Sequence, residues 1–482
     1  MIVMKFGGTS VEDEAAIERA AAIVFSRLEE KPVVVVSALA GVTDALLSMS
    51  RAAAAGQIRE AVKQLRALRR RHFQVLEELA SECPHEVRHE IQKLFAAVED
   101  MLRGVAALGE LTLRTTDNIL CAGELLSSRM VSAAFVARGL AAELVDSREC
   151  IVTDASHTNA IPRFELTDER LRQLLQPLLD VDRVPVMAGF IAATSNGIAT
   201  TLGRGGSDFS AAIVGAALNA KRIEIWTDVE GMMTTDPRLC PQARRIDVIR
   251  FDEAAEMAYF GAKVLHPATL IPAIRRNIPV YVMDSRRPES RGTCIRARAP
   301  RSRTTFRAIA AKSGMKVVSV RSARRLGVNG FLRAVFETFE RYTCAADLVS
   351  TSEVSVSVAL SGSAPLDAMI AELRKLGEVE VEDRKAIICL IGKDIRGRVG
   401  VAASVFQTLA AADINVHMIS QGASEINIGF VIEESDVPEA VRQLHRRFFE
   451  QAKSERVTRL QIVPRGMRVA GRARVAMRRE VG

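Results

Sequence analysis

Two glycine-rich stretches are the places in this sequence where a phosphate or a carboxylate could bind. Residues 200–212 read Thr-Thr-Leu-Gly-Arg-Gly-Gly-Ser-Asp-Phe-Ser-Ala-Ala, and three glycines let a backbone come close to a ligand. Arg204 lies between these glycines and carries a planar guanidinium suited to either anion. Apolar residues at helical spacing follow in Phe209–Leu218, so we expect a helix with Ser207 or Asp208 as its N-cap. Free N–H groups at such a helix end attract anions.

The second stretch, Lys5-Phe6-Gly7-Gly8-Thr9-Ser10, opens the chain directly after a short apolar strand. Its spacing matches neither the G-x-x-x-x-G-K-[ST] of a P-loop nor the G-x-G-x-x-G of a dinucleotide fold. Lys5 instead precedes the glycines, where a fixed positive charge can neutralise a phosphoryl group in transfer. A glycine turn before a capped helix is the plain alternative for either stretch alone, but two such stretches favour an anion site.

The elements that must position these loops alternate between strands and helices from residue 1 to about 297. Pro32–Ser37 is a continuous apolar strand, as expected in the middle of a parallel sheet covered on both faces. The chain then turns into a helix, which places Ser37 and Thr43 at the carboxyl edge of the sheet, where open α/β folds bind ligands.

Two further polar positions follow from the same pattern. Glu124 lies in an apolar helical stretch, where a buried carboxylate needs a partner, and the pattern alone favours a structural salt bridge. The strand Lys221–Thr227 runs into a long irregular loop that carries Asp228 and Arg238, and loops of this kind gather binding groups.

An internal repeat begins near residue 304, after a charged, proline-containing segment that makes the best domain boundary. Val335-Phe336-x-Thr338 recurs as Val405-Phe406-x-Thr408, and each unit reads strand, loop, helix, strand, strand, helix. Because the strand–helix pattern before the boundary is complete, we expect truncation at Arg303 to leave a folded first unit.

Composition excludes several classes of protein. A chain of 482 residues with 48% hydrophobic and 26% charged residues predicts two or three globular domains, and no apolar run reaches the length of a membrane span. The chain enters a strand at once, which leaves no room for a signal peptide and predicts a cytoplasmic protein. Seven scattered cysteines without a C-x-x-C predict reduced, buried thiols and no metal site. The last eighteen residues carry six arginines and one glutamate, five of the eight net positive charges, so the charge predicts a solvated tail and no nucleic-acid partner.

The motifs KFGGTS, LGRGGSD, WTDVEG, TTDPR and FGAKVLHP, in this order, resemble those of the aspartate kinases in the amino-acid kinase superfamily. The two βαββαβ units resemble tandem ACT domains, which bind amino acids at paired interfaces. The resemblance extends to about Pro464 and implies an α/β amino-acid kinase fold followed by two α+β domains. The implied divisions are a catalytic domain at 1–297, ACT domains at 304–385 and 386–464, and a basic tail at 465–482.

The resemblance implies ATP-dependent phosphorylation of the β-carboxylate of L-aspartate to 4-phospho-L-aspartate, the first step of lysine, threonine and methionine synthesis. A carboxylate is ionised at pH 7, so this reaction needs no general base. Catalysis then rests on holding two anionic groups in line and offsetting their repulsion. The implied cofactors are ATP and Mg²⁺, and since Mg²⁺ prefers phosphate oxygens and water, no dedicated protein cage is expected.

Position by position, the resemblance assigns residues of this chain to three roles. The catalytic group comprises Lys5, Arg204 and Asp208. The residues implied to contact aspartate are Ser37, Thr43, Glu124, Arg204 and Ser207, a role that would replace the salt bridge of Glu124. The residues implied to contact ATP are Lys5, Gly7, Gly8, Thr9, Thr227, Asp228, Met233, Arg238 and Lys263. Met233 stands where many relatives have an aromatic residue, and a thioether can cover an adenine face by dispersion.

The ACT segments imply an allosteric amino acid and association between chains. The implied effector contacts are Phe331, Leu332, Asp347, Ser352 and Glu353. Their surroundings resemble the lysine-sensitive enzymes, although Arg325 and Val328 depart from that pattern. Lysine is therefore the expected effector, and threonine or no effector at all are the alternatives. Paired ACT units also predict a homodimer or a higher oligomer.

Two other functions compete with this interpretation. Amino-acid kinases that act on glutamate, acetylglutamate or carbamate share the glycine loops, but they typically lack FGAKVLHP and paired ACT units. A catalytically inactive effector-binding protein would not need Lys5, Glu124, Arg204 and Asp228, all of which are present.

Overall fold

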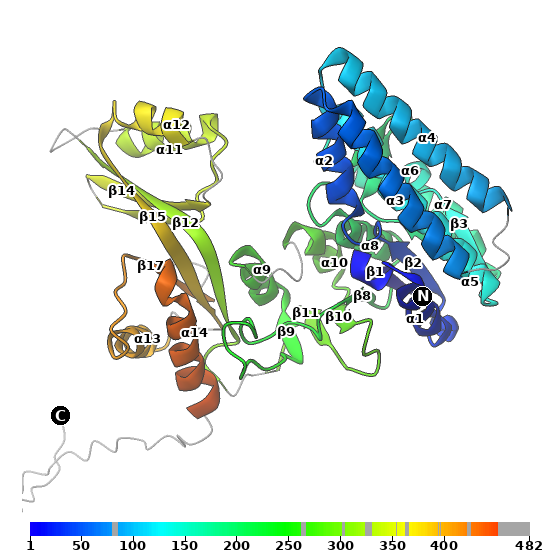
Figure 1. The fold of residues 1–482 in the computed structure, drawn as a ribbon. Coiled ribbons are helices and arrows are strands. Elements are labelled where there is room, and N and C mark those ends of the chain that lie inside the picture. The colour runs from blue at the N-terminus through cyan, green and yellow to red at the C-terminus, as the bar shows by residue number, and fades with distance from the viewer. Residues whose placement is uncertain are drawn as a thin grey trace, which may run out of the picture.

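The structure, a computed structural model, describes residues 1–79, 85–261, 267–300, 304–322, 330–352, 354–361, 366–393, 395, 397–421 and 426–451. It has two lobes, which lie on either side of helix α9 (Phe251–Tyr259) (Figure 1). The first lobe contains an eight-stranded sheet and the second a six-stranded sheet. The predicted fold class, a parallel-rich α/β unit followed by α+β units, is confirmed.

Seven neighbouring strand pairs make the eight-stranded sheet, and all run parallel except β10 with β11. In spatial order its strands are β3 (Ala142–Val145), β5 (Val184–Ala188), β2 (Pro32–Val36), β1 (Ile2–Phe6), β8 (Ile223–Thr227), β10 (Val280–Asp284), β11 (Thr293–Arg296) and β9 (Val248–Arg250). Every residue of β1 and β2 is buried, as their apolar runs predict for central parallel strands.

Helices cover both faces of this sheet. Alternation along β1 directs Ile2, Met4 and Phe6 to one face and Val3 to the other, so Lys5 shares the face of Val3. The helices against the first face are α1 (Glu14–Phe25), α2 (Val42–Ala54), α3 (Ile58–Leu79), α4 (His85–Leu108) and α5 (Leu113–Ala137). Those against the second are α6 (Ser147–Cys150), α7 (Phe164–Asp180), α8 (Gly206–Ala217) and α10 (Ile271–Arg276).

Two smaller features complete the first lobe. A three-stranded sheet joins β4 (Val152–Thr153) to the hairpin of β6 (Ile191–Thr194) and β7 (Ala199–Thr201). Helix α5 is long and apolar enough to cross a membrane, but 83% of its most apolar 18-residue window is buried inside the lobe. That degree of burial is typical of the core helix of a globular domain.

The six-stranded sheet is built around two long antiparallel strands, β12 (Ala308–Ser322) and β15 (Gly377–Ile391). Strand β14 (Ser355–Ser361) pairs with the second half of β12, and β17 (Asn427–Glu433) pairs with the second half of β15. The sheet edges are β13 (Leu348–Thr351) and β16 (Met418–Ser420). Helices α11 (Phe331–Arg341) and α12 (Leu366–Leu373) cover one half, and α13 (Val401–Ala410) and α14 (Val437–His445) cover the other.

The two repeat units therefore share their longest strands. The first unit shows the predicted order, β12-α11-β13-β14-α12-β15. The second unit is completed by the first half of β12, because Ala308–Lys312 pairs with Ile387–Ile391. The expected division between residues 385 and 386 falls inside β15, and the domain bounds themselves remain predictions.

The lobes also share hydrophobic cores. Phe251, Met257 and Phe260 of the first lobe belong to one cluster of buried side chains with Met315 and Ile387 of the second. The polar boundary near residue 303 predicts a first unit that folds alone. The shared core argues against that expectation, because a cut there would expose the α9 face to water.

Candidate active site

The two glycine loops meet at the carboxyl ends of β1 and β8. Lys5 Nζ lies 2.7 Å from Asp208 Oδ1, and the side chains are only 11% and 13% exposed. Lys5 reaches this position because the alternation of β1 directs it towards α8, whose first turn carries Asp208. This ion pair joins one glycine loop to the other.

The N-cap of α8 is Gly205, so the prediction of Ser207 or Asp208 as the cap is wrong. Gly203 and Gly205 both have left-handed backbones, with φ of 75° and 72°, which turns the chain into the helix two residues earlier than expected. The side chains of Ser207 and Asp208 are thereby left available to the site.

At Gly8 the first glycine loop passes so close to the end of β2 that a larger residue would not fit. A Cβ on Gly8 would lie 2.9 Å from the carbonyl oxygen of Ala38, and a Cβ on Gly7 would lie 3.5 Å from Lys5 Nζ. Gly7 N donates to the carbonyl oxygen of Trp226 at 2.9 Å, and a single 3-10 turn that includes Thr9 follows. The loop therefore presents its backbone beside the Lys5 ammonium.

Glu124 faces this region from α5 and is buried, with 3% exposure. Its Oε1 accepts a hydrogen bond from Ala38 N at 3.3 Å, while Oε2 has no partner among the residues that the structure describes. Burial in apolar surroundings raises the pKa of Glu124 to about 8, and the backbone hydrogen bond from Ala38 opposes that rise. Among the residues that the structure describes, no cation forms the salt bridge predicted from the pattern alone. A cation close to Oε2 would favour the ionised form of the carboxyl group.

Ser37 and Thr43 lie where the sequence predicts, at the end of β2 and in the first turn of α2. Both are half-buried. Ser37 N donates to Phe6 O at 3.1 Å, and Ala40 N donates to Gly8 O at 3.2 Å, so this segment is tied to the first glycine loop.

Arg204 is exposed, and its guanidinium makes no ion pair or hydrogen bond within the described part of the chain. The preceding residue, Gly203, packs closely against Asn159, because a Cβ there would lie 2.5 Å from Asn159 Oδ1. A free guanidinium beside a helix N-terminus is a ready partner for a carboxylate or a phosphate.

Asp117 is a buried residue that sequence reasoning missed. It lies two turns before Glu124 on α5, and its carboxylate accepts hydrogen bonds from Thr158 N at 3.1 Å and Thr201 Oγ1 at 2.6 Å. His157 Nδ1 lies 2.7 Å from the other oxygen. Asp117 therefore fixes the segment that packs against Gly203. The sequence did contain a sign of its importance: Asp117 is a carboxylate seven residues before Glu124, in the same apolar helix.

The expected nucleotide side lies at the end of β8. Thr227 Oγ1 donates to Asp228 Oδ1 at 3.2 Å, and Ser285 N donates to Thr227 O at 2.9 Å. Ser285, which the sequence did not single out, also shares a 2.8 Å hydrogen bond with Ser10 of the first glycine loop. These contacts connect the residues expected to bind ATP with the loop that holds Gly7.

The loop after β8 carries Met233 and Arg238. Met233 is half-buried and forms an isolated β-bridge with Arg245. The Arg238 side chain is 85% exposed and bidentate with Asp236, at 2.6 Å and 3.0 Å, so it is held in one orientation without a ligand. Lys263 lies outside the described residues.

The expected effector residues lie in the first repeat unit. Phe331 and Leu332 begin α11 directly after Gly330, whose φ is 105°. Asp347 is 7% exposed and pairs with Lys312 Nζ at 2.6 Å, so its charge is already neutralised. The Ser352 hydroxyl shares a 2.7 Å hydrogen bond with that of Ser355. Glu353 lies outside the described residues.

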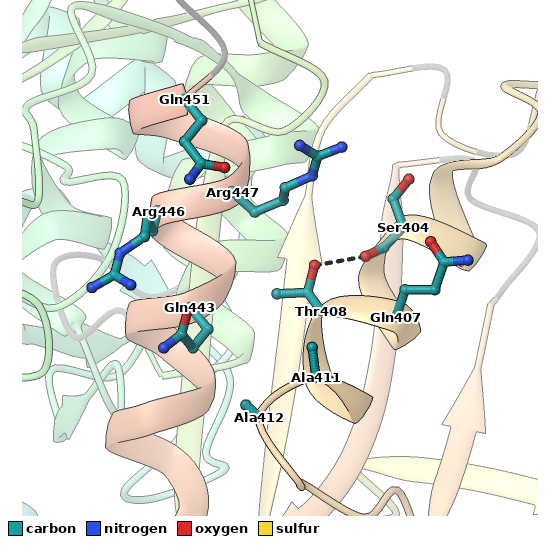
Figure 2. A pocket seen from close by; sticks show the side chains of 9 residues that line it. All are labelled: Ser404, Gln407, Thr408, Ala411, Ala412, Gln443, Arg446, Arg447 and Gln451. Carbon is teal, nitrogen blue, oxygen red and sulfur yellow. Dashed lines mark hydrogen bonds between the residues drawn. The ribbon is translucent and has the colours of Figure 1, made fainter.

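A separate groove lies between α13 and α14 in the second unit, with a volume of about 350 Å³ (Figure 2). It is lined by Ser404, Gln407, Thr408, Ala411, Ala412, Gln443, Arg446, Arg447 and Gln451. None of the predicted site residues borders this groove.

Comparison with known proteins gives family and fold. Residues 1–284 match the amino acid kinase family, and residues 388–448 match the ACT domain. The chain is 38% identical to lysine-sensitive aspartokinase 3 of Escherichia coli, covering 93% of this chain and 99% of that protein. It is 35% identical to chloroplastic aspartokinase 2 of Arabidopsis thaliana, with 93% and 84% covered.

Solved structures agree with these relatives. Aspartokinase III of E. coli in complex with aspartate and ADP, in its R-state, superposes with a TM-score of 0.82 at 38% identity, covering 92% of this chain and 99% of that one. The same enzyme in complex with lysine and aspartate, in its T-state, gives 0.79 at 37% identity, with 93% and 99% covered.

Proposed function

This chain belongs to the aspartokinases of the amino acid kinase family, and we propose that it transfers the γ-phosphoryl group of ATP to the β-carboxylate of L-aspartate. The product, 4-phospho-L-aspartate, is the first intermediate on the way to lysine, threonine and methionine.

The observation that carries the proposal is the buried carboxyl group of Glu124. One of its oxygens has no partner among the described residues, and burial holds its pKa near 8. The ammonium group of an amino acid would supply the missing partner and favour the ionised form. Arg204 offers the opposite charge on the second glycine loop, so the two residues suit a zwitterionic substrate.

The remaining polar groups suit a phosphoryl transfer. Lys5 is held beside the first glycine loop by Asp208, so its ammonium is oriented before any ligand binds. Ser37, Thr43 and Ser207 offer hydroxyl groups around the same edge of the sheet. Because the acceptor is itself a carboxylate, the chain needs to hold the reactants in line and offset their charge, and no residue is required as a general base.

ATP would lie along the first glycine loop and the loop after β8. The close approach of Gly8 to Ala38 excludes a side chain from this loop, so its backbone stays accessible to a ligand. Asp228 and Asp208 supply oxygen ligands of the kind that Mg²⁺ prefers. Bound Mg²⁺ would neutralise charge on the phosphates. Thr9, Thr227, Met233, Arg238 and Lys263 complete the proposed nucleotide contacts.

We infer that an amino acid regulates the enzyme through the second lobe, with lysine as the effector and threonine as the alternative. The E. coli relative has been captured in complex with lysine, which supports this choice. The proposed contacts are Phe331, Leu332, Asp347, Ser352 and Glu353. Two ACT units with exposed edges also favour a homodimer or a larger assembly.

We also retain the domain bounds of 1–297, 304–385 and 386–464 as proposals, with the qualification that β12 and β15 serve both repeat units. A cytoplasmic location is proposed as well, and it is supported by six free cysteines in the described part of the chain, five of them buried.

A hydroxamate assay for acyl phosphates tests the proposed function directly. The purified chain with ATP and Mg²⁺ should give aspartyl hydroxamate from L-aspartate and little signal from L-glutamate, N-acetylglutamate or carbamate. A stronger signal from another acceptor would assign a different amino-acid kinase. No signal from any acceptor, together with tight binding of lysine, would indicate an inactive effector-binding protein.

A further inference from the structure

The hairpin formed by residues 231–247 joins the nucleotide side of the site to the second lobe. Thr234 N donates to Arg244 O at 2.8 Å, and Ile246 N donates to Met232 O at the same distance. On its outer side, Thr234 O accepts from Ile309 N of β12 at 2.7 Å. The hairpin is thus hydrogen-bonded at Thr234 to the sheet of the second lobe.

The tip of the hairpin places one side chain, that of Cys240, in the core of the second repeat unit. Cys240 is 1% exposed and belongs to the same cluster of buried side chains as Ile309, Val405 and Leu444. The loop expected to bind ATP therefore packs against α13 and α14, although its sequence lies within the kinase part of the chain.

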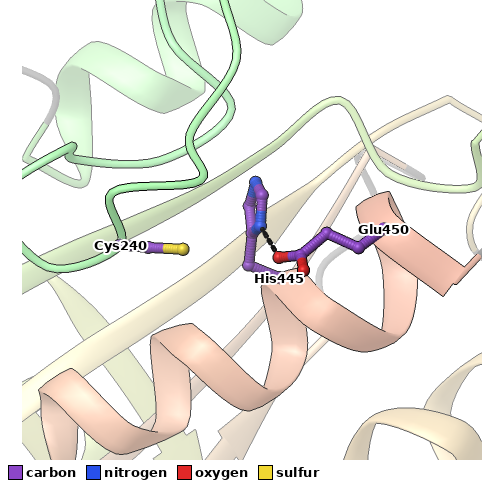
Figure 3. Close-up of side chains that lie close together, drawn as sticks. All are labelled: Cys240, His445 and Glu450. Carbon is purple, nitrogen blue, oxygen red and sulfur yellow. Dashed lines mark hydrogen bonds and ion pairs between the residues drawn. The ribbon is translucent and has the colours of Figure 1, made fainter.

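His445, the last residue of α14, lies between this hairpin and the end of the helical turn η5 (Arg446–Glu450) (Figure 3). The residue is fully buried, with Nε2 2.9 Å from Thr234 Oγ1 and Nδ1 2.8 Å from Glu450 Oε1. Its ring stacks on Phe449 at 4.9 Å. Phe449 O in turn accepts a hydrogen bond from Arg244 Nη1 at 3.2 Å, so both strands of the hairpin are held.

The donors and acceptors can be assigned from chemistry. An ionised Glu450 can only accept, so Nδ1 of His445 carries a proton. Thr234 Oγ1 accepts from Arg244 N at 2.9 Å, which leaves its own proton free to be donated to Nε2. A neutral ring satisfies this chain of bonds, in the order Glu450, His445, Thr234.

We propose that His445 is a positioning residue for ATP: it reaches from the regulatory lobe to fix Thr234 and, through it, the hairpin that carries Met233 and Arg238. The proposal rests on the proposed function, which assigns those two residues to the nucleotide. It makes the geometry of the nucleotide site depend directly on the second ACT unit, which lies next to Thr234.

A metal ion is the alternative for this cluster. Cys240, His445 and Glu450 place one ligand atom each within 4.8 Å of one another. Both nitrogens of His445 are already hydrogen-bonded to protein groups, however, and the thiol of Cys240 donates to Gln242 Oε1 at 3.5 Å. The hydrogen-bonded arrangement accounts for all three side chains.

Two substitutions separate the two bonds of His445. In His445→Asn, the side-chain amide lies where Nδ1 was, so it keeps the bond to Glu450 and loses Thr234. In His445→Gln, the amide reaches the place of Nε2 and keeps a bond to Thr234. We expect the Kd of MgATP, titrated without aspartate, to rise about 3- to 10-fold in the Asn variant, the scale of one lost buried hydrogen bond, and to stay near wild type in the Gln variant.

Thr234→Val should weaken MgATP binding at least as much, and the double variant Thr234→Val/His445→Asn should lose no more than Thr234→Val alone. Val405→Ala is the matched control, since it makes a cavity in the same buried cluster without touching the hairpin's hydrogen bonds. It should lower the melting temperature and leave the Kd of MgATP unchanged. The KM for aspartate should stay within twofold in every variant.

Three results would overturn the inference: an unchanged Kd in His445→Asn, an equal rise in Val405→Ala, or one zinc ion per purified chain that is lost in Cys240→Ser. The titration does not depend on turnover. A wild-type chain that makes no aspartyl phosphate would refute the proposed function, while the Kd values would still decide the role of His445.

Discussion

The raised pKa of Glu124 predicts that aspartate binds more tightly as the pH rises towards 8, and that Glu124→Gln abolishes this pH dependence. The carboxyl group is neutral in most free molecules at pH 7, because burial raises its pKa from 4.5 to about 8. Binding an ammonium requires the ionised form of Glu124. At any pH below the pKa, the free energy needed to deprotonate the carboxyl group therefore weakens aspartate binding. Each unit below it lowers the competent fraction about tenfold, which is about 1.4 kcal/mol.

The apparent KM for aspartate should therefore fall about tenfold between pH 6 and 7, fall less steeply towards pH 8, and level off above it. Glu124→Gln cannot ionise, so its KM should be high and nearly independent of pH over the same range. Glu110→Gln removes an exposed carboxylate just before α5 and serves as the control, with the wild-type profile expected.

The measurement is the hydroxamate assay at saturating MgATP, with aspartate varied at each pH. A wild-type KM that stays level from pH 6 to 8 would refute the reasoning, because it would mean that Glu124 is ionised without a substrate. A pH-dependent KM that persists in Glu124→Gln would assign the titration to another group.

The stability of the same variant gives an independent check. A carboxyl group whose folded-state pKa is raised binds more protons folded than unfolded between pH 4.5 and 8, so wild-type stability falls as pH rises through that range. At pH 5 the melting temperature of Glu124→Gln should be close to that of the wild type. At pH 8.5 it should be higher than that of the wild type at the same pH, and scanning calorimetry measures both values.

Three further substitutions and one truncation follow from the site and the shared core. Lys5→Ala should lower kcat about 100-fold or more with a smaller loss of ATP affinity, and wild-type turnover would remove Lys5 from catalysis. Arg204→Lys keeps the charge but loses the planar fork, so the KM for aspartate should rise while that for ATP stays nearly unchanged; equal damage to both would indicate a folding role. A chain ended at residue 303 should aggregate or lose its cooperative thermal transition, because the α9 face would be uncovered, and a sharp transition in calorimetry would show that the lobes fold separately. Asp347→Ala should relieve inhibition by lysine without changing uninhibited turnover, and unaltered inhibition would exclude Asp347 from the effector site.

Local pattern predicted the elements of the first lobe well. These elements depend on residues that are adjacent in the sequence: the apolar runs of β1 and β2, and the glycine loops that follow β1 and β7. A parallel sheet is buried on both faces, so its strands are continuous apolar runs that are easily recognised. The helix start at Gly206 was placed late because a left-handed glycine and a polar cap satisfy the same free N–H groups in different ways.

Partners distant in the chain could not be predicted in this way. Nothing near Lys5 in the sequence indicates that Asp208 will neutralise it, and an apolar context around Glu124 does not say whether a cation stands opposite. The sequence repeat correctly predicted the order of strands and helices in the first unit of the second lobe. A repeat does not show which strands pair, so it did not predict that both units use β12 and β15.

The shared strand β12 has a consequence for the order in which the chain can mature. Its first half, Ala308–Lys312, leaves the ribosome long before the second half of β15 and β17, which lie beside each other in the completed second unit. That unit can close only after the first unit has been made, and α14 with His445 is made later than α13, β16 and β17 of the same unit. A nascent chain with both glycine loops already folded would still lack the contact to Thr234, so synthesis itself would delay the appearance of a fully ordered nucleotide site until α14 has been made.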